Sequence, residues 1–263
     1  MNALRHFLKL AWLNVGFYGG IVCITAITIL VMTLPALCYF VCIKGYDKGK
    51  ATRHIIWYYG RAWTKLLICF VPVRLENCDR ALPKPCIITP NHQSFFDTYC
   101  FAFMPEPDIV FAVRAWPFRM PFYGPYMRLA GYLNTESGNA EEFLRQARAM
   151  LHAGACIGIF PEGHRSIGGK MQRFHSGAFH LSVMTGVPVL PVCIDGTGDF
   201  LRRGGFLLRP ATIRIRVLDP IYPEHFAAFG DEAPLKLRAA AKAAIQRSLE
   251  EFAFRSSAGL NTT

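Results

Sequence analysis

The stretch Ala11–Ile43 carries no charged side chain, and this constrains the fold more than any other feature of the sequence. It is longer than the apolar core of a signal peptide, so it is not expected to be a cleaved leader. As one straight helix it would be roughly 50 Å long, whereas the core of a bilayer is about 30 Å thick. Pro35, with Gly16, Gly19 and Gly20 before it, allows a kink or a hairpin. A hydrophobic membrane anchor is the favoured interpretation, and a buried core helix is the alternative.

Basic residues flank this stretch on both sides. Arg5 and Lys9 precede it. The residues that follow it are Lys44, Lys48, Lys50 and Arg53. Positive charge marks the cytoplasmic side of a membrane segment, so both ends are predicted to be cytoplasmic. A re-entrant or hairpin anchor fits that symmetry, and a single tilted span remains open. We therefore expect a membrane protein whose remaining chain lies on the cytoplasmic side.

The next segment, Arg53–Phe70, alternates apolar and basic residues in the pattern of an amphipathic helix. Trp63, Leu67 and Phe70 supply apolar positions, and Arg61 and Lys65 interrupt them. Such a helix suits the lipid interface, but it could equally pack on a sheet. Residues 1–70 are accordingly predicted to be membrane-anchoring helices.

From Val71 onward, short apolar strands alternate with helices. The predicted strands are Val73–Leu75, Cys86–Thr89, Ile109–Val113, Cys156–Phe160, Val189–Ile194 and Thr212–Val217. The predicted helices are Ser94–Phe103, Ala140–His152, Gly177–Thr185 and Pro234–Phe254. Strands that are apolar throughout belong to a sheet covered on both faces. The prediction is an α/β fold, in which residues 71–255 form a single mixed-sheet domain covered by helices and residues 256–263 form a frayed tail.

Composition narrows the partners. The formal net charge is +11 and 52% of residues are hydrophobic, which indicates a membrane-associated protein with an anionic partner. No zinc-ligand spacing, recognition helix or aromatic RNA-binding strand is recognisable, so nucleic acid is not expected. An anionic lipid surface explains the charge better. The nine cysteines contain no Cys-x-x-Cys pair, which favours a reducing compartment without disulfides or a metal site.

A candidate catalytic pair lies in Cys86–Asp97. The apolar start predicts a buried strand, Pro90 and Asn91 end it, and His92 falls on the turn that follows. Asp97 lies five residues after His92, a spacing that can bring its carboxylate onto the imidazole. The carboxylate would then orient the ring so that its other nitrogen takes a proton from a hydroxyl. Ser94 and Asp97 also form a capping-box pattern, in which Asp97 would only satisfy free N–H groups.

A second stretch, Ile157–Ser166, repeats the pattern of an apolar strand that ends at a proline. Together, the two stretches resemble the glycerolipid acyltransferase family, whose best-known members are the 1-acylglycerol-3-phosphate acyltransferases. The resemblance rests on Asn91, His92 and Asp97, on Phe160–Ser166, and on the Val-Pro-rich strand Val187–Val192. These blocks follow one another in order, and the resemblance covers about residues 70 to 220.

The resemblance implies transfer of an acyl group from a thioester, on acyl-CoA or acyl carrier protein, to the hydroxyl of a lysophospholipid. His92 would be the general base and Asp97 would orient it. The residues implied in substrate binding are Glu162, Gly163, Arg165, Ser166 and Arg114. No metal or other cofactor is implied. Backbone N–H groups near Gly163 or just after Asn91 are expected to stabilise the oxyanion.

Two departures from the family pattern concern the acceptor. His164 stands where the family has Thr, and Glu136 and Ser137 replace an Asp-Arg pair. Arg128 or Arg173 could supply the missing phosphate contact. Because Arg114, Arg128, Arg165 and Arg173 lie in or near the matching blocks, the acceptor is expected to be 1-acylglycerol-3-phosphate, with a lyso-aminolipid as the alternative. A thioesterase and a non-catalytic lipid-binding module are the other readings. The aromatic stretch Pro117–Tyr126 either lines an acyl channel or packs in the core. Acyl chain length and oligomeric state are not predicted.

Overall fold

The computed structural model of the chain describes residues 2–166 and 170–258, and these residues form a seven-stranded sheet. The strand order is β1-β7-β6-β2-β5-β3-β4. The strands are β1 (Val73–Glu76), β2 (Ile87–Pro90), β3 (Ile109–Val113), β4 (Leu133–Asn134), β5 (Cys156–Ile159), β6 (Val189–Asp195) and β7 (Ile213–Val217). Neighbouring strands are parallel, except that β6 and β7 are antiparallel. The predicted mixed sheet is confirmed.

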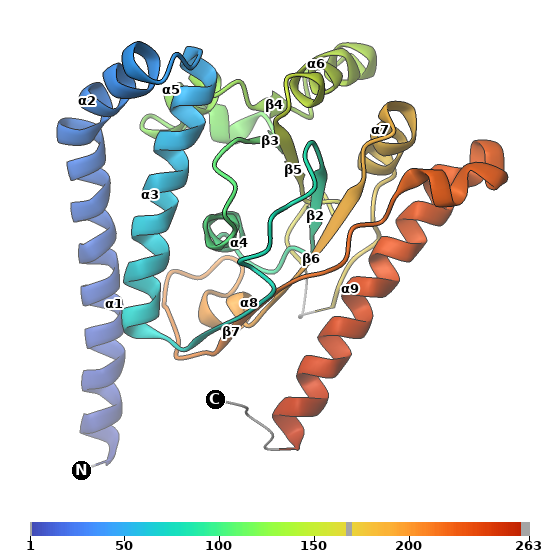
Figure 1. Cartoon of the computed structure of the whole chain (residues 1–263). Coiled ribbons are helices and arrows are strands. Elements are labelled where there is room, and N and C mark those ends of the chain that lie inside the picture. Colours follow the sequence, from blue (N-terminus) through green and yellow to red (C-terminus); the bar gives the residue numbers. More distant parts are fainter. Residues whose placement is uncertain (1, 167–169, 259–263) are drawn as a thin grey trace.

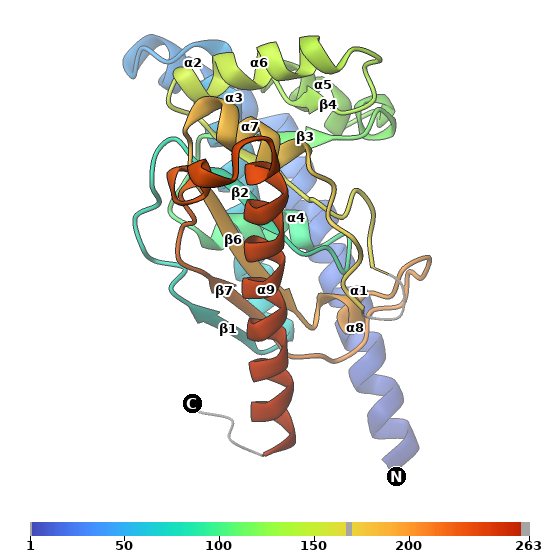
Figure 2. The ribbon, with the colours of Figure 1, turned by 90° about the vertical axis from the view of Figure 1, so that its right-hand side faces the viewer.

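Helices cover both faces of the sheet. The α-helices are α1 (Asn2–Ile27), α2 (Thr33–Cys38), α3 (Lys48–Phe70), α4 (Asp97–Cys100), α5 (Tyr123–Leu129), α6 (Ala140–His152), α7 (Gly177–Thr185), α8 (Thr197–Phe200) and α9 (Ala233–Ser257). Helices α1 and α3 lie on one side of the sheet, while α7 and α9 lie on the other (Figures 1 and 2). The α/β class follows directly from this layering.

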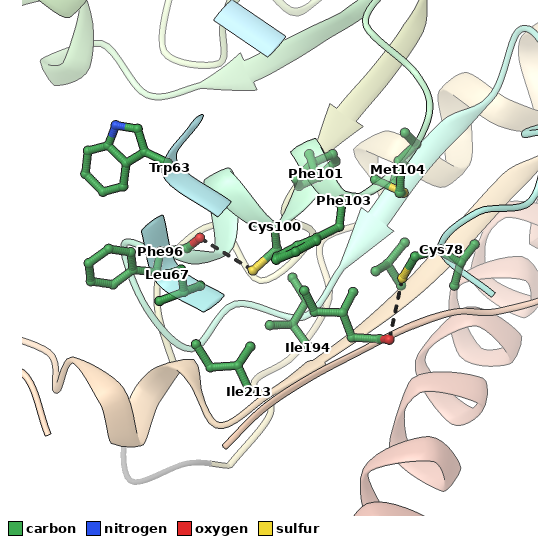
Figure 3. Close-up of a cluster of buried hydrophobic side chains, with 14 of the residues drawn as sticks. Trp63, Leu67, Cys78, Phe96, Cys100, Phe101, Phe103, Met104, Ile194 and Ile213 are labelled. Carbon is green, nitrogen blue, oxygen red and sulfur yellow. Dashed lines mark hydrogen bonds between the residues drawn. The ribbon is translucent and has the colours of Figure 1, made fainter. Parts of the chain in front are cut away.

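Two hydrophobic cores fill the space between the sheet and its helices. On the α9 side, Phe179, Leu237 and Ile245 pack with residues of the central strands. On the other side, Trp63 and Leu67 of α3 share a core with Phe96, Ile194 and Ile213, as Figure 3 shows. Leu13 and Phe17 of α1 belong to this second core. One core thus joins the helices before residue 70 to the sheet that follows.

The uncharged N-terminal stretch is helical from end to end. Two π-helical turns, Thr28–Met32 and Tyr39–Ile43, flank α2, and the helix bends there (Figure 1). The bend has a local cause, because Pro35 in α2 lacks an N–H to donate. In the π turn before it, hydrogen bonds span five residues, as from the N–H of Thr33 to the carbonyl of Thr28. The Thr33 hydroxyl donates to the carbonyl of Thr28 at 2.7 Å. The predicted kink is confirmed, but the chain does not reverse inside Ala11–Ile43.

The reversal comes at residues 44–47, where Gly45 adopts φ +67° and Asp47 caps α3 by accepting from the N–H of Lys50. Helix α3 then returns along α1 and packs on the sheet, the second of the two alternatives stated for it. Arg53, predicted as a flanking membrane charge, is instead buried, and its Nε donates to Asp108 at 2.6 Å. The charge is paired inside the protein because a lone buried guanidinium would be costly.

Two helices match their predictions residue for residue, α6 and α7. Asn139 caps the start of α6, and Gly186, at φ +70°, ends α7. The predicted helix Ser94–Phe103 is wrong in length, since only Asp97–Cys100 is α-helical and a 3₁₀ turn follows. The two-residue strand β4 was missed because so short a segment carries no periodic signal. Helix α9 continues through Ser257, and residues 259–263 of the predicted tail lie outside the described residues.

Candidate active site

His92 sits directly after β2, at the end of a central strand. The side chain of Asn91 fixes this turn to β6: its Nδ2 donates to the carbonyl of Ile194, and its Oδ1 accepts from the N–H of Ile194, both at 2.8 Å. Because both partners are buried, these paired bonds replace the water that the turn has lost. The position of His92 is therefore set by two neighbouring parallel strands.

The Asp97 carboxylate holds His92 and the turn together. Its Oδ2 accepts from Nδ1 of His92 at 2.8 Å and from the backbone N–H groups of Gln93 and Ser94 at 2.5 and 2.8 Å. Its Oδ1 accepts from the hydroxyl of Thr197 at 2.5 Å. The relay and the capping alternatives are thus both realised in one fully buried carboxylate. Thr197, at the start of α8, was missed, because nothing in its local sequence marks it.

The geometry of the imidazole leaves one nitrogen available. An ionised Asp97 can only accept from Nδ1, so in the neutral ring the lone pair is on Nε2. The ring stacks on Phe160, with centroids 4.0 Å apart, and its side chain is 17% exposed. His92 lines a cavity of about 430 Å³. The arrangement can accept a proton from a hydroxyl held in that cavity.

Glu162, in the loop after β5, is bonded to the turn after β2 that carries His92. The family resemblance had suggested that it binds substrate. Its Oε1 accepts from the N–H of His92 at 2.7 Å, and its Oε2 accepts from the N–H of Gln172 at 2.6 Å. Burial raises the pKa of its carboxyl, and the two backbone N–H groups oppose that rise. Ser166 adds a third link by donating its N–H to the carbonyl of His92 at 2.7 Å.

The backbone N–H groups expected to bind an oxyanion are already engaged. Those of His92, Gln93 and Ser94 donate to Glu162 or Asp97, and that of Gly163 donates to the carbonyl of Phe160. The structure therefore does not leave these four groups free for an oxyanion, because two buried carboxylates accept from three of them and a backbone carbonyl accepts from the fourth.

Basic side chains line one part of the cavity. Gly163, His164 and Arg165 contribute to this lining, and so does Arg203 from the loop after α8. Arg203 donates from Nη1 to the carbonyl of Arg165 at 3.0 Å. Neither Arg128 nor Arg173 is among the described residues that line the cavity, and Arg128 instead donates to the carbonyl of Phe118. Arg203, rather than Arg128 or Arg173, thus lines the cavity together with Arg165. Sequence spacing could not have identified it.

Arg114 also lines the cavity, but a carboxylate already holds it. Its Nε donates to Glu136 at 2.6 Å, and the N–H of Ala115 donates to the other oxygen at 2.9 Å. The N–H of Ala115, followed by Arg114, lowers the pKa of Glu136. Ser137 donates its hydroxyl to the carbonyl of Asn134. Of the two residues that depart from the family pattern, Glu136 and Ser137, Glu136 thus pairs with Arg114 and compensates its charge.

The rest of the cavity is mainly apolar and aromatic. Its walls come from the end of α1, from α3, and from the segment that the sequence offered as a channel lining or as core. From that segment, Pro117, Met120, Phe122, Tyr123 and Tyr126 line the cavity. Hydroxyl groups bridge the walls, since Tyr59 lies 2.8 Å from Thr25 and 3.0 Å from Tyr123. The lining alternative is therefore the one observed, and the cavity suits a long apolar group.

The site therefore combines a partly exposed imidazole on a buried carboxylate, at the end of a central strand, with basic and apolar walls. Residues 72–195 match the family model described as Acyltransferase. Among curated proteins, the chain is 31% identical over 167 residues to a chloroplastic 1-acyl-sn-glycerol-3-phosphate acyltransferase of Brassica napus, covering 62% of this chain and 48% of the relative. It is 26% identical to the protein of that name from Pseudomonas aeruginosa, covering 72% and 73%.

A solved structure agrees with these matches. The 1-acyl-sn-glycerophosphate acyltransferase PlsC of Thermotoga maritima superposes with a TM-score of 0.66 at 26% identity, covering 88% of this chain and 95% of that one. Over residues 72–195 the chain is thus similar to the acyltransferases, and the fold agrees with that of PlsC. The chain spans about half the length of the first plant relative, at 48%.

Proposed function

We propose that this chain transfers a fatty acyl group from an acyl thioester, carried by coenzyme A or acyl carrier protein, to the hydroxyl of a lysophospholipid. The proposed acceptor is 1-acylglycerol-3-phosphate, and the product is phosphatidic acid. The observation that carries the proposal is the His92–Asp97 pair, whose free ring nitrogen lies at an apolar cavity with arginines in its wall. The relatives named for this reaction support it.

In the proposed reaction, Nε2 of His92 takes the proton of the acceptor hydroxyl as its oxygen attacks the thioester carbon. Asp97 stabilises the imidazolium that forms, and its remaining hydrogen bonds keep the carboxylate in place. The C–S bond then breaks, and the imidazolium returns the proton to the departing thiolate. The substrate supplies the nucleophile, so the protein needs no covalent intermediate.

Binding roles follow from position. Arg165 and Arg203 are proposed to hold the acceptor head group, because a planar guanidinium pairs well with phosphate. Glu162 and Ser166 are proposed to position His92 through its backbone rather than to touch substrate. The apolar walls are proposed to hold the acyl chain. Residues 1–70 are proposed to anchor the protein, with the catalytic domain of residues 71–255 on the cytoplasmic side.

The test is acyl transfer by the purified full chain, with a labelled acyl donor and 1-acylglycerol-3-phosphate. His92→Ala should lower the rate by about 10²-fold or more, because the general base is removed. His180→Ala is the matched control, since His180 is exposed on α7. Near-normal transfer by a folded His92→Ala protein would refute the mechanism.

A second acceptor, a lyso-aminolipid, is favoured by one observation. Glu136 places a carboxylate beside Arg114, where the family pattern has an Asp-Arg pair, and Ser137 adds no charge. The Asp of the family pattern is also a carboxylate, so the difference is the positive charge missing at Ser137, and its loss weakens the attraction for a phosphate. Parallel assays with 1-acylglycerol-3-phosphate and a lyso-aminolipid decide between the two, and a preference for the aminolipid would replace the proposed acceptor.

A further inference from the structure

The loop between α8 and β7 exposes large apolar side chains next to basic ones. Phe206 is 86% exposed and Leu207 is 52% exposed. Arg202, Arg203 and Arg209 flank them, and no Asp or Glu of the described residues forms an ion pair with these arginines. Exposed apolar side chains inside a rim of arginines form a surface suited to anionic lipid.

Two side chains of α1 bind the backbone of this loop. Asn14 donates from Nδ2 to the carbonyl of Leu208 at 3.1 Å and accepts from its N–H at 2.8 Å. The hydroxyl of Tyr18 donates to the carbonyl of Phe206 at 2.6 Å. Leu208 is fully buried in the core that contains Phe17. The buried Leu208 and these bonds leave Phe206 and Leu207 directed away from the core.

The outward face of α1 continues the same surface. Val15, next to Asn14 on the helix, is 75% exposed. Trp12 is 71% exposed and lies further round the helix, where its ring contacts Phe70 of α3. Figure 2 shows the segment after α8 projecting beside α1. The hydrogen bonds of Asn14 and Tyr18 thus hold the exposed loop next to the helix that carries these apolar side chains.

We propose that residues 202–209 form a second membrane contact, in which Phe206 and Leu207 enter the interface of the bilayer and Arg202 and Arg209 bind anionic lipid phosphates. The proposal rests on the membrane association in the proposed function and adds to it a contact outside the N-terminal stretch. Continuity with the face of α1 favours lipid over an acidic protein as the occupant. Arg203 reaches the cavity wall, so this contact would also hold that wall at the lipid surface.

The test uses the full chain in vesicles of mixed anionic and zwitterionic lipid, with the photoreactive residue p-benzoylphenylalanine at one position at a time. At Phe206 it should cross-link to phospholipid. At Phe254, which is 69% exposed on α9 on the opposite side of the sheet, lipid cross-linking should be absent (Figures 1 and 2). At Trp12, lipid cross-linking reports the membrane association itself.

Each outcome has one reading. Lipid adducts at Trp12 but not at Phe206 would overturn the loop contact, whereas no adducts at either would overturn the membrane association. Adducts at Phe206 to an added acyl carrier protein instead of lipid would also overturn the proposal. A double variant, Arg202→Gln with Arg209→Gln, should lose the excess of adducts on anionic over purely zwitterionic vesicles. Arg247→Gln on α9 is the matched charge control and should leave that excess unchanged.

Discussion

At the scale of single residues, Asp97 shows how one carboxylate serves structure and chemistry together. It accepts hydrogen bonds from the ring of His92, from two backbone N–H groups and from Thr197. Ionised carboxylates have room for that many donors, and charge-assisted bonds are the strong ones. The turn and the catalytic orientation therefore depend on the same buried charge.

Replacing that charge without changing its shape should separate the two roles. In Asp97→Asn the side-chain oxygen can still accept from the ring and the two amides, and the new NH₂ can donate to Thr197. We expect a folded protein whose kcat falls by about 10²-fold or more, because the imidazolium loses its counter-charge. Steady-state kinetics and a thermal melt measure both effects. Asp199→Asn, exposed on α8, should behave as wild type, and a loss of stability with unchanged kcat would leave Asp97 a purely structural cap.

Arg165 tests the acceptor site. Arg165→Ala should raise the acceptor KM about tenfold to a hundredfold, because one charge-assisted contact is worth about 1.5–3 kcal/mol. The KM of the acyl donor should change little. Arg173→Ala is the matched control, since Arg173 is exposed and outside the cavity lining. An unchanged acceptor KM in Arg165→Ala would remove this loop from the head-group site.

The sequence predicted the residue pair but not its surroundings. Local spacing relates His92 to Asp97, so their contact could be anticipated from the turn between them. Thr197 and Arg203 reach the site through strand order and loop packing, and Thr197 lies 100 residues from Asp97 in the chain. No local pattern encodes that distance. Glu162 was predicted to bind substrate, and in the structure both of its carboxylate oxygens accept backbone N–H groups. Sequence does not reveal which backbone groups need an acceptor.

At the scale of elements, the close approach of α1 and α3 depends on glycines. A Cβ at Gly16 would lie 2.9 Å from the Phe70 ring, and one at Gly20 would lie 2.8 Å from Leu66. Small residues let two helices approach closely. From the sequence, these glycines allow a kink or a hairpin, whereas in the structure they face the neighbouring helix.

This packing gives a paired test. Gly16→Ala combined with Gly20→Ala should lower the melting temperature of the full chain, because both methyl groups meet side chains of α3 closer than van der Waals contact. Gly19→Ala meets nothing within 4 Å and should be neutral or slightly stabilising, since alanine favours helix. Equal melting temperatures for the double variant and Gly19→Ala would mean that α3 yields without cost.

The predicted elements succeed where one physical cause dominates. Helices α6 and α7 have clear capping or terminating residues, and their bounds were predicted correctly. The segment after Ser94 has the composition of a helix, but the Asp97 carboxylate takes the N–H groups of its first residues and holds them in a turn. The hydrogen bonds of Asp97 there outweigh helical propensity, which is a weak determinant by itself.

At the scale of the whole molecule, helix α1 has one apolar face that is exposed and another that is buried against the rest of the protein. The described stretch Phe7–Ile43 is long and apolar enough to cross a membrane, and an 18-residue window within it has a mean hydropathy of 2.5. Yet Phe17 is fully buried and packs edge-on against Trp63, Phe70 and Phe200. Composition alone cannot distinguish a face that meets lipid from one that meets protein, because both are apolar. Deleting residues 1–44 would therefore remove part of the core along with the proposed anchor.

Changing one face at a time separates anchoring from folding. Trp12→Ser, Val15→Ser and Val22→Ser together alter only side chains that are at least 66% exposed. We expect this variant to need less detergent for solubility and to bind vesicles more weakly, while its melting temperature in detergent stays close to wild type. Phe17→Ala is the opposing control: it should destabilise the fold by about 3–5 kcal/mol through the cavity it leaves, with the outward face intact. Sedimentation with vesicles and thermal melts measure the two properties. If the triple serine variant kept full vesicle binding in high salt, where charge attraction is screened, the anchor would have to lie on another surface of the protein.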